Sequence, residues 1–126
     1  MSGYVTGSVR EDAERLGHGG WVAGVFFADD AAESARTTAA LEIKYWAYER
    51  GGGQSHPDKV SATLEWSLIL SGRVTARLGD EHVELAAGDY ALIHPGTPNN
   101  MVAEVLEDVT AITVKAPSDP SAKHVL

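Results

Sequence analysis

Two side chains of this sequence are candidates for proton transfer. Glu65 lies in the apolar run "TLEWSLIL", residues 63–70, and His94 precedes a Pro-Gly turn in "GDYALIHPGTPNN", residues 88–100. A carboxyl group buried among apolar neighbours has a raised pKa, which suits a general acid or base near neutral pH. Glu65 and His94 facing each other across one cavity would form an acid–base pair. Each also has a structural interpretation, as a solvated strand residue for Glu65 and a turn-stabilising histidine for His94.

The alternation of residues around Glu65 predicts an enclosed polar pocket. Leu64, Trp66, Leu68 and Leu70 fall on one face of the run, and Thr63, Glu65, Ser67 and Ile69 fall on the other. Buried polar groups need hydrogen-bond or ionic partners, which a pocket would supply. We expect a small organic ligand to contact Ser67, Asn99 and the aromatic side chains of residues 41–49, namely Tyr45, Trp46 and Tyr48. Lys44 is interpreted as a surface lysine, with an anion-binding role as the alternative.

Short runs of strand length position these residues. They cover residues 41–49, 63–70, 73–78, 82–86, 89–94, 101–106 and 109–116, and the breaks between them, such as "SG", "GDE" and "PGTPNN", have turn chemistry. "WVAGVFF", residues 21–27, is typical of a buried strand. Such a series predicts an all-β, single-domain antiparallel barrel or sandwich. We assign residues 1–20 to an N-terminal arm, 21–115 to the barrel and 116–126 to an irregular surface tail.

Composition excludes several classes of function. The chain of 126 residues has no cysteine, and its 18 acidic and 10 basic residues give a net charge of −8. Thiolate chemistry is therefore excluded, and the charge disfavours nucleic-acid and anionic-membrane partners. The sequence shows no signal peptide, membrane-spanning run, phosphate loop or Ser-His nucleophile pattern. We expect a cytoplasmic protein.

Two segments resemble the paired motifs of the cupin superfamily. Residues 65–72, "EWSLILSG", match the glutamate and glycine that end the first motif. Residues 88–99 match the second motif at Gly88 and Gly96, with His94 at its first proline and Asn99 at its histidine. The resemblance implies a jelly-roll barrel, or double-stranded β-helix, that is commonly dimeric and has a pocket in its mouth.

The resemblance also implies a metal site of three histidines and a glutamate, from which this sequence departs. Only Glu65 stands in its expected position, because the two histidine positions before it fall on Asp58 and Val60 or on Lys59 and Ser61. Allowing a longer loop, His56-Pro57-Asp58 or Gln54-Ser55-His56 would replace them. The best metal set is then His56, Glu65 and Asn99, which is a poor one for Fe, Mn, Ni or Zn because an amide oxygen is a weak ligand. We therefore expect no cofactor, with a divalent transition metal as the alternative.

Three functions follow, in order of preference. The first is a metal-independent isomerase, epimerase, cyclase or lyase that transfers protons through Glu65 and His94. The second is a non-catalytic ligand-binding or accessory protein, whose signature would be an apolar barrel with Glu65 in a salt bridge to Lys44 or Arg73. The third is a metal-dependent oxygenase or isomerase with a degenerate site. In each case we expect a small-molecule ligand and a homodimer that covers Trp66, Leu68, Leu70 and part of the N-terminal strand around residues 21–27.

Overall fold

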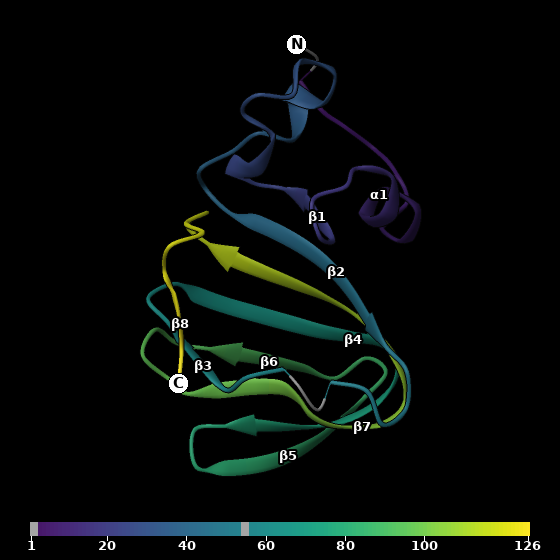
Figure 1. Ribbon diagram of the computed structural model, residues 1–126, viewed down its shortest axis with the longest axis vertical. Helices are drawn as coiled ribbons and strands as arrows, with labels where there is room; N and C mark the ends of the chain where they lie inside the picture. Colours follow the sequence, from purple (N-terminus) through teal and green to yellow (C-terminus); the bar gives the residue numbers. More distant parts are fainter. Residues whose placement is uncertain (1–2, 54–55) are drawn as a thin grey trace.

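The computed structural model describes residues 3–53 and 56–126 and confirms the all-β antiparallel prediction (Figure 1). The short helical elements all lie before residue 37. They are the α-helix α1 (Val9–Arg15) and the 3₁₀ helices η1 (Val25–Phe27) and η2 (Ala31–Arg36). The strands are β1 (Trp21–Ala23), β2 (Glu42–Tyr48), β3 (Lys59–Ser61), β4 (Leu64–Leu78), β5 (Glu81–Ala86), β6 (Tyr90–Ile93), β7 (Asn99–Ala116) and β8 (Lys123–Val125). No helix in the described ranges is both long and apolar enough to cross a membrane.

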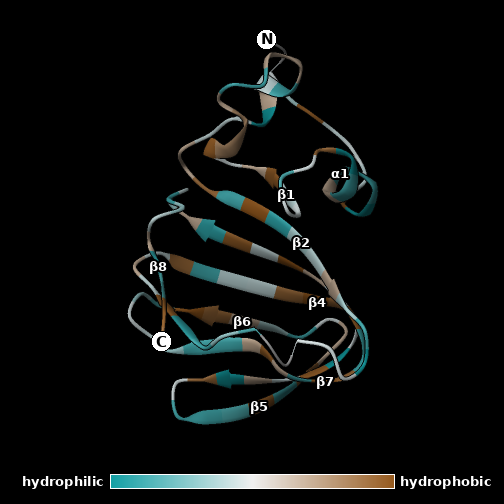
Figure 2. Cartoon of the chain, viewed as in Figure 1, coloured by the Kyte–Doolittle hydropathy of each residue, from teal (hydrophilic) through white to brown (hydrophobic). Residues whose placement is uncertain are grey.

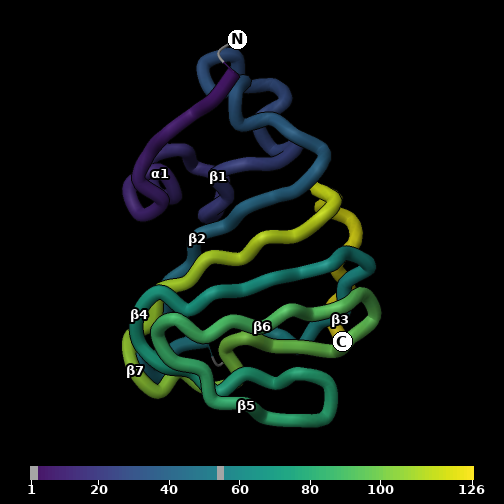
Figure 3. The backbone as a smooth tube through the Cα atoms, turned by 180° about the vertical axis from the view of Figure 1, so that it is seen from behind, coloured from purple at the N-terminus to yellow at the C-terminus, as the bar shows by residue number. Residues whose placement is uncertain are grey.

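Two long strands, β4 and β7, form the backbone of the fold. They pair with each other from Leu64↔Ala116 to Leu78↔Asn99, with several register shifts along the way. One half of this pair is extended by β2 and β1 on the β7 side and by β6 on the β4 side. The other half is extended by β3 and β8 beside β7 and by β5 beside β4. Figures 1 and 3 show the two halves curling towards each other.

The length of β4 and β7 corrects the predicted strand boundaries. The runs at residues 63–70 and 73–78 form one strand, and so do the runs at 101–106 and 109–116. The break at "SG" is a bend rather than a chain reversal, because Gly72 has φ +82° and the ladder resumes on the same partner strand. Bulges let a strand bend and twist without leaving its sheet. Each long strand therefore serves both halves of the curled sheet.

Two other predicted segments also differ from the structure. The strand expected over residues 21–27 ends at Ala23, since Gly24 has φ +136° and directs the chain into η1. The tail expected to be irregular contains β8, which pairs with β3 through Lys59↔Val125 and Ser61↔Lys123. Both segments thereby come to lie at one end of the barrel.

The hydrophobic core fills the other end of the barrel. Alternation along the strands, visible as alternating colours in Figure 2, directs one face of each strand inwards. The core consists of eleven side chains from β4 to β7: Ile69, Val74, Ala76, Leu85, Ala91, Ile93, Met101, Val102, Val105, Val109 and Ala111. The buried charged side chains of β2, β3, β4 and β7, namely Glu42, Lys59, Glu65 and Lys115, lie outside this apolar cluster, and we call their end of the barrel the polar end.

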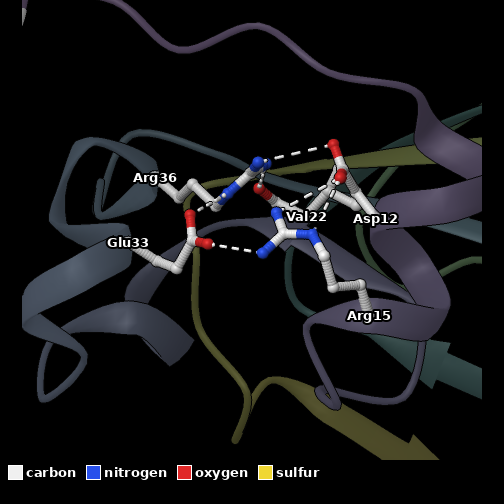
Figure 4. A network of polar contacts seen from close by, with 5 residues as sticks. All are labelled: Asp12, Arg15, Val22, Glu33 and Arg36. Carbon is white, nitrogen blue, oxygen red and sulfur yellow. Dashed lines mark hydrogen bonds and ion pairs between the residues drawn. The ribbon is translucent and has the colours of Figure 1, made fainter.

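An ionic network joins the parts of the N-terminal segment to one another (Figure 4). Arg36, only 7% exposed, donates to the Val22 carbonyl oxygen at 3.1 Å and to Glu33 Oε2 at 2.9 Å. Arg36 also pairs with Asp12 on α1, and Arg15 connects Asp12 with Glu33. A bidentate guanidinium can hold several segments in one geometry. The network thus ties α1, β1 and η2 together beside β2.

Candidate functional site

A cavity of about 270 Å³ opens at the polar end of the barrel. The strand register explains its polar wall, because Glu42 on β2 and Glu65 on β4 both lie opposite Lys115 of the central strand β7. The next inward row consists of Lys44, Thr113 and Ser67, and the row below it of Trp46, Ala111 and Ile69. Along the strands the first row is therefore charged, the second combines Lys44 with two hydroxyl groups, and the third is apolar.

Glu65 is the centre of a buried ion cluster. Its Oε1 accepts a hydrogen bond from Lys59 Nζ at 2.9 Å and lies 3.5 Å from Lys115 Nζ. The three side chains are 4%, 9% and 11% exposed. Burial lowers the pKa of Lys59, although Glu65 opposes this shift by stabilising the ammonium. A lysine whose pKa is lowered in this way gives up its proton more readily than a surface lysine.

Glu42 is a second buried carboxyl group in the cavity wall. It is 2% exposed, and its Oε2 accepts a hydrogen bond from Ser118 Oγ at 3.0 Å. Burial raises the pKa of Glu42, while the Ser118 hydrogen bond and Lys115 oppose the change. Burial thus shifts the pKa values of Glu42 and Lys59 towards neutrality from opposite sides.

The raised pKa of Glu42 predicts a pH-dependent stability. The folded chain holds this proton more tightly than the unfolded chain, so the stabilisation is complete below the unfolded pKa and is lost as pH rises through the folded pKa. Glu42→Gln should therefore match the wild type near pH 4 and become the more stable of the two as pH approaches about 7. Urea unfolding across this range measures the difference.

The exposed Glu84→Gln is the matched control for Glu42→Gln, because Glu84 lies in a solvent-accessible ion pair on β5. Its effect should stay within about 1 kcal/mol at every pH. If the difference between Glu42→Gln and the wild type did not change with pH, Glu42 would have the same proton affinity in both states.

The remaining walls are largely apolar and come from segments distant in the sequence. Trp21 and Phe26, stacked with ring centroids 4.8 Å apart, reach the cavity from the N-terminal segment. Trp46 donates its Nε1 hydrogen to Thr113 Oγ1 at 2.8 Å, and Thr113 Oγ1 lies 2.7 Å from the buried Ser67 Oγ. Asp119, Pro120 and Lys123 line the cavity from the C-terminal segment. Both ends of the chain thus complete the mouth of the cavity.

The structure brings together only some of the residues predicted from the sequence. Glu65, Trp46, Tyr48 and His56 line the cavity, and Ser67 supports it through Thr113. Tyr45 does not line it, because alternation along β2 places Tyr45 on the face opposite Trp46. His94 is exposed at the turn after β6 and is also absent from the lining, so Glu65 and His94 do not share this cavity.

Of the predicted metal ligands, His56 and Glu65 line the cavity and Asn99 does not. His56 lines the cavity, where burial lowers its pKa, and its buried Nδ1 has no hydrogen-bond partner among the described residues. Asn99 is buried at the start of β7 and donates through Nδ2 to the Thr97 carbonyl oxygen at 3.0 Å. Asp58 pairs with Arg77 and accepts a hydrogen bond from Asn100. The alternative register through Gln54 and Ser55 lies outside the described residues.

The residues at the implied ligand positions do not fit a divalent metal. Lys59 and Ser61 are the buried pair preceding Glu65, and the Lys59 ammonium already donates to the carboxylate that would bind the ion. A protonated amine has no lone pair to offer a metal, and two lysines already neutralise Glu65. Within residues 3–53 and 56–126, no group of three His, Cys, Asp or Glu side chains is placed to hold an ion.

Sequence reasoning missed most of the charged wall. It assigned Lys44 to the surface and gave no role to Glu42, Lys115 or Lys123. One signal was available, because Glu42 and Lys44 alternate with Trp46 and Tyr48 and must share their face. The salt bridges of Glu65 also run to Lys59 and Lys115, not to Lys44 or Arg73 as the binding-protein hypothesis required.

Solved structures of similar fold come from several bacteria. An uncharacterized conserved protein with a double-stranded β-helix domain from Klebsiella pneumoniae has a TM-score of 0.61 and 21% identity, covering 70% of this chain and 76% of its own. DMSP lyase DddQ from Ruegeria pomeroyi has a TM-score of 0.61 and 17% identity, covering 71% of this chain but only 44% of its own. The nucleoside dehydratase Pac13 of Streptomyces has a TM-score of 0.59 and 15% identity, covering 71% and 70%. Identities this low show a shared fold alone.

Comparison by sequence gives the family. No curated protein matches the chain significantly. The model of the cupin domain, however, matches residues 45–115, more than half of the chain, and these residues contain β3 to β6 with most of β2 and β7. Together with the curled antiparallel sheet and the double-stranded β-helix of its structural neighbours, this match shows that the chain belongs to the cupin superfamily.

Proposed function

We propose that this cupin is a lyase- or isomerase-type enzyme that moves protons on a small molecule through Lys59 and Glu42, without a metal, and that Glu65 positions Lys59. The observation that carries the proposal is the buried Lys59–Glu65–Lys115 cluster in the cavity wall, with a lysine at an implied ligand position. Two structural neighbours are described as a lyase and a dehydratase. Enzymes of these types commonly remove a proton and a leaving group from their substrates.

The groups in the wall suit such a reaction. The Glu42 carboxylate would take a proton from an acidic C–H bond, so that an O–H bond forms and the C–H electron pair moves into the substrate. The Lys59 ammonium would then give a proton either to a leaving group, which completes an elimination, or to another carbon, which completes an isomerisation. General acids and bases work best with pKa values near the working pH, the direction in which burial shifts both groups. Glu65 holds Lys59 in position.

A non-catalytic binding protein is the second candidate. It is favoured by the pairing of Glu65, whose Oε1 already has two lysine partners. In that case the cluster would fix the shape of the cavity and transfer no proton.

Solvent deuterium incorporation tests proton transfer without knowledge of the substrate. Panels of 2-oxo acids, 3-hydroxy acids and unsaturated acids, together with the neutral amide of each, would be incubated in D₂O and followed by ¹H NMR. We expect loss of one C–H signal in at least one compound, with the rate reduced roughly 100-fold or more by Lys59→Met or Glu42→Gln, in line with the loss of a general acid or base. Arg50→Met, at an exposed position after β2, is the control and should leave the rate unchanged.

Three outcomes would contradict the proposal. A rate lost on chelator treatment and restored by Fe, Mn, Ni or Zn would favour a metal-dependent enzyme. A rate unaffected by Lys59→Met would remove the assigned acid. Binding of a panel compound without any exchange would favour the non-catalytic candidate.

We also infer that the protein forms a homodimer through the outer face of β4 and β6. Tyr90 and Leu92 are 63% and 51% exposed there, and they lie opposite Leu68 and Trp66. Exposed apolar side chains gathered on one sheet face mark an interaction surface. Light scattering after size exclusion should give twice the chain mass of 13.4 kDa. Leu92→Asp should shift the protein towards monomer and the exposed Ala103→Asp should not, whereas a wild-type monomer at micromolar concentration would contradict the inference.

A further inference from the structure

All four lysines of the chain line the same cavity. Lys44, Lys59, Lys115 and Lys123 are the only lysines in the sequence, and each contributes to the cavity wall. They come from four strands, β2, β3, β7 and β8. Lysine is ordinarily a solvated surface residue. Here Lys59 and Lys115 are buried, Lys44 is half-buried and the exposed Lys123 stands at the edge of the same cavity, in a chain of net charge −8.

The charges of the wall leave a positive excess. Four ammonium groups face the carboxylates of Glu42, Glu65 and Asp119, a difference of 4 − 3 = +1 before the protonation of Glu42 is considered. Lys59 and Lys115 are paired with Glu65. In the described part of the chain, neither Lys44 nor Lys123 forms an ion pair with a carboxylate. The two unpaired ammonium groups are therefore free to bind an anion.

A bound anion would stabilise the charged form of Lys44. Its Nζ lies 5.4 Å from the centroid of the Trp21 ring, and burial, followed by repulsion from Lys123, Lys115 and Lys59, lowers its pKa. A buried cation is costly unless an opposite charge compensates it. A bound carboxylate would supply that charge.

The other walls indicate what the anion is attached to. Trp21, Phe26, Trp46, Met101 and Val102 form apolar surface around the charged row. The volume of about 270 Å³ lies at the lower limit of ordinary small-molecule sites, roughly 300–1,000 Å³. A small molecule with one acidic group and a compact apolar or aromatic body matches both the charge and the lining.

We infer that the ligand of this cavity is a small organic carboxylate, with its acid group held by Lys44 and Lys123 and its apolar body against Trp21, Phe26 and Trp46. This inference names the substrate class of the proposed enzyme, and it rests on the same cavity as the proposed function but not on any chemical step. A carboxylate brings a single negative charge, which balances the excess of the wall.

Binding of matched probes by calorimetry tests the inference. Phenylacetate has the required charge and body, phenylacetamide has the same shape without the charge, and inorganic phosphate has charge without the body. We expect phenylacetate to bind at least 10-fold more tightly than either of the other two. Lys44→Met and Lys123→Met should each weaken phenylacetate by about 10-fold, as expected for the loss of one charge-assisted hydrogen bond. Arg50→Met removes the same charge from an exposed position and should change binding less than 2-fold.

Three results would overturn the inference. Phenylacetamide binding as tightly as phenylacetate would show that charge is not recognised. Equal losses of phenylacetate affinity in Arg50→Met and Lys44→Met would show that the overall charge of the protein, and not a specific contact with Lys44, affects binding. Tighter binding of phosphate than of phenylacetate would identify a phosphate-bearing ligand.

Chemical labelling of the native protein provides a readout that needs no variant. Acetylation of lysine amines, followed by peptide mass spectrometry, should modify Lys44 and Lys123 several-fold more slowly when phenylacetate is present. A short peptide amine added to the same solution is the internal reference and should react at an unchanged rate. Unchanged acetylation of both lysines at saturating phenylacetate would contradict the assigned position.

The two proposals can fail separately. Carboxylate binding without deuterium exchange would end the enzymatic proposal and keep the inference. Deuterium exchange into neutral compounds, together with no binding of phenylacetate, would do the reverse.

Discussion

Glu65→Leu should destabilise the fold by about 3–5 kcal/mol, because removing one partner of a buried ion pair leaves an uncompensated charge. Here the substitution leaves two, since Lys59 and Lys115 share Glu65 Oε1. The variant should regain stability as pH rises towards about 10, because burial lowers the pKa of Lys59 in the folded chain while an unfolded lysine keeps a pKa near 10.4. Urea denaturation at pH 7 and pH 9.5 measures both effects.

Substitutions of different members of the ion cluster should cost different amounts of stability. Lys59→Met removes one cation but leaves Glu65 paired with Lys115, so it should cost less than Glu65→Leu. Glu84→Leu, in the exposed Arg73–Glu84 pair on the outside of the barrel, should cost no more than about 1 kcal/mol. A loss below 1 kcal/mol for Glu65→Leu would mean that Lys59 and Lys115 are not charged in the folded protein.

Gly72→Ala should destabilise the fold by about 3 kcal/mol or more, from strain and overpacking together. Gly72 has φ +82°, where a side chain costs about 1–2 kcal/mol. Its Cβ would also lie 1.9 Å from the Asp108 carbonyl oxygen of the paired strand β7. Because that neighbour is backbone, relieving the contact requires β4 and β7 to separate at their bend.

Gly79→Ala measures backbone strain without overpacking, and so separates the two contributions expected in Gly72→Ala. Gly79 has φ +62°, but a Cβ there would meet no atom within 4 Å. We expect it to cost only the backbone strain of about 1–2 kcal/mol. Equal losses in the two alanine variants, measured by urea denaturation, would show that close approach of β4 and β7 does not require glycine at position 72.

The cavity wall shows where sequence patterns stop being informative. Alternation places Glu42, Lys44, Trp46 and Tyr48 on one face of a strand, but a period of two does not say which face is turned inwards. Residues 41–48 carry aromatic side chains on both faces, so either assignment was compatible with the pattern. The pairing of β2 with β7 decides it, by placing Glu42 and Lys44 opposite Lys115 and Thr113.

The class of fold, the inward position of Glu65 and the departure from the metal-binding pattern all follow from the sequence. Each depends on local information: strand-length runs separated by turn residues, a polar face opposite an apolar one, and residue types at motif positions. In contrast, the position of His94 outside the cavity and of all four lysines around it depends on contacts between distant strands. Lys44, Lys59, Lys115 and Lys123 meet because β2, β3, β7 and β8, far apart along the chain, end at the same mouth. Strand register and the curl of the sheet, which no local pattern specifies, bring these charges together.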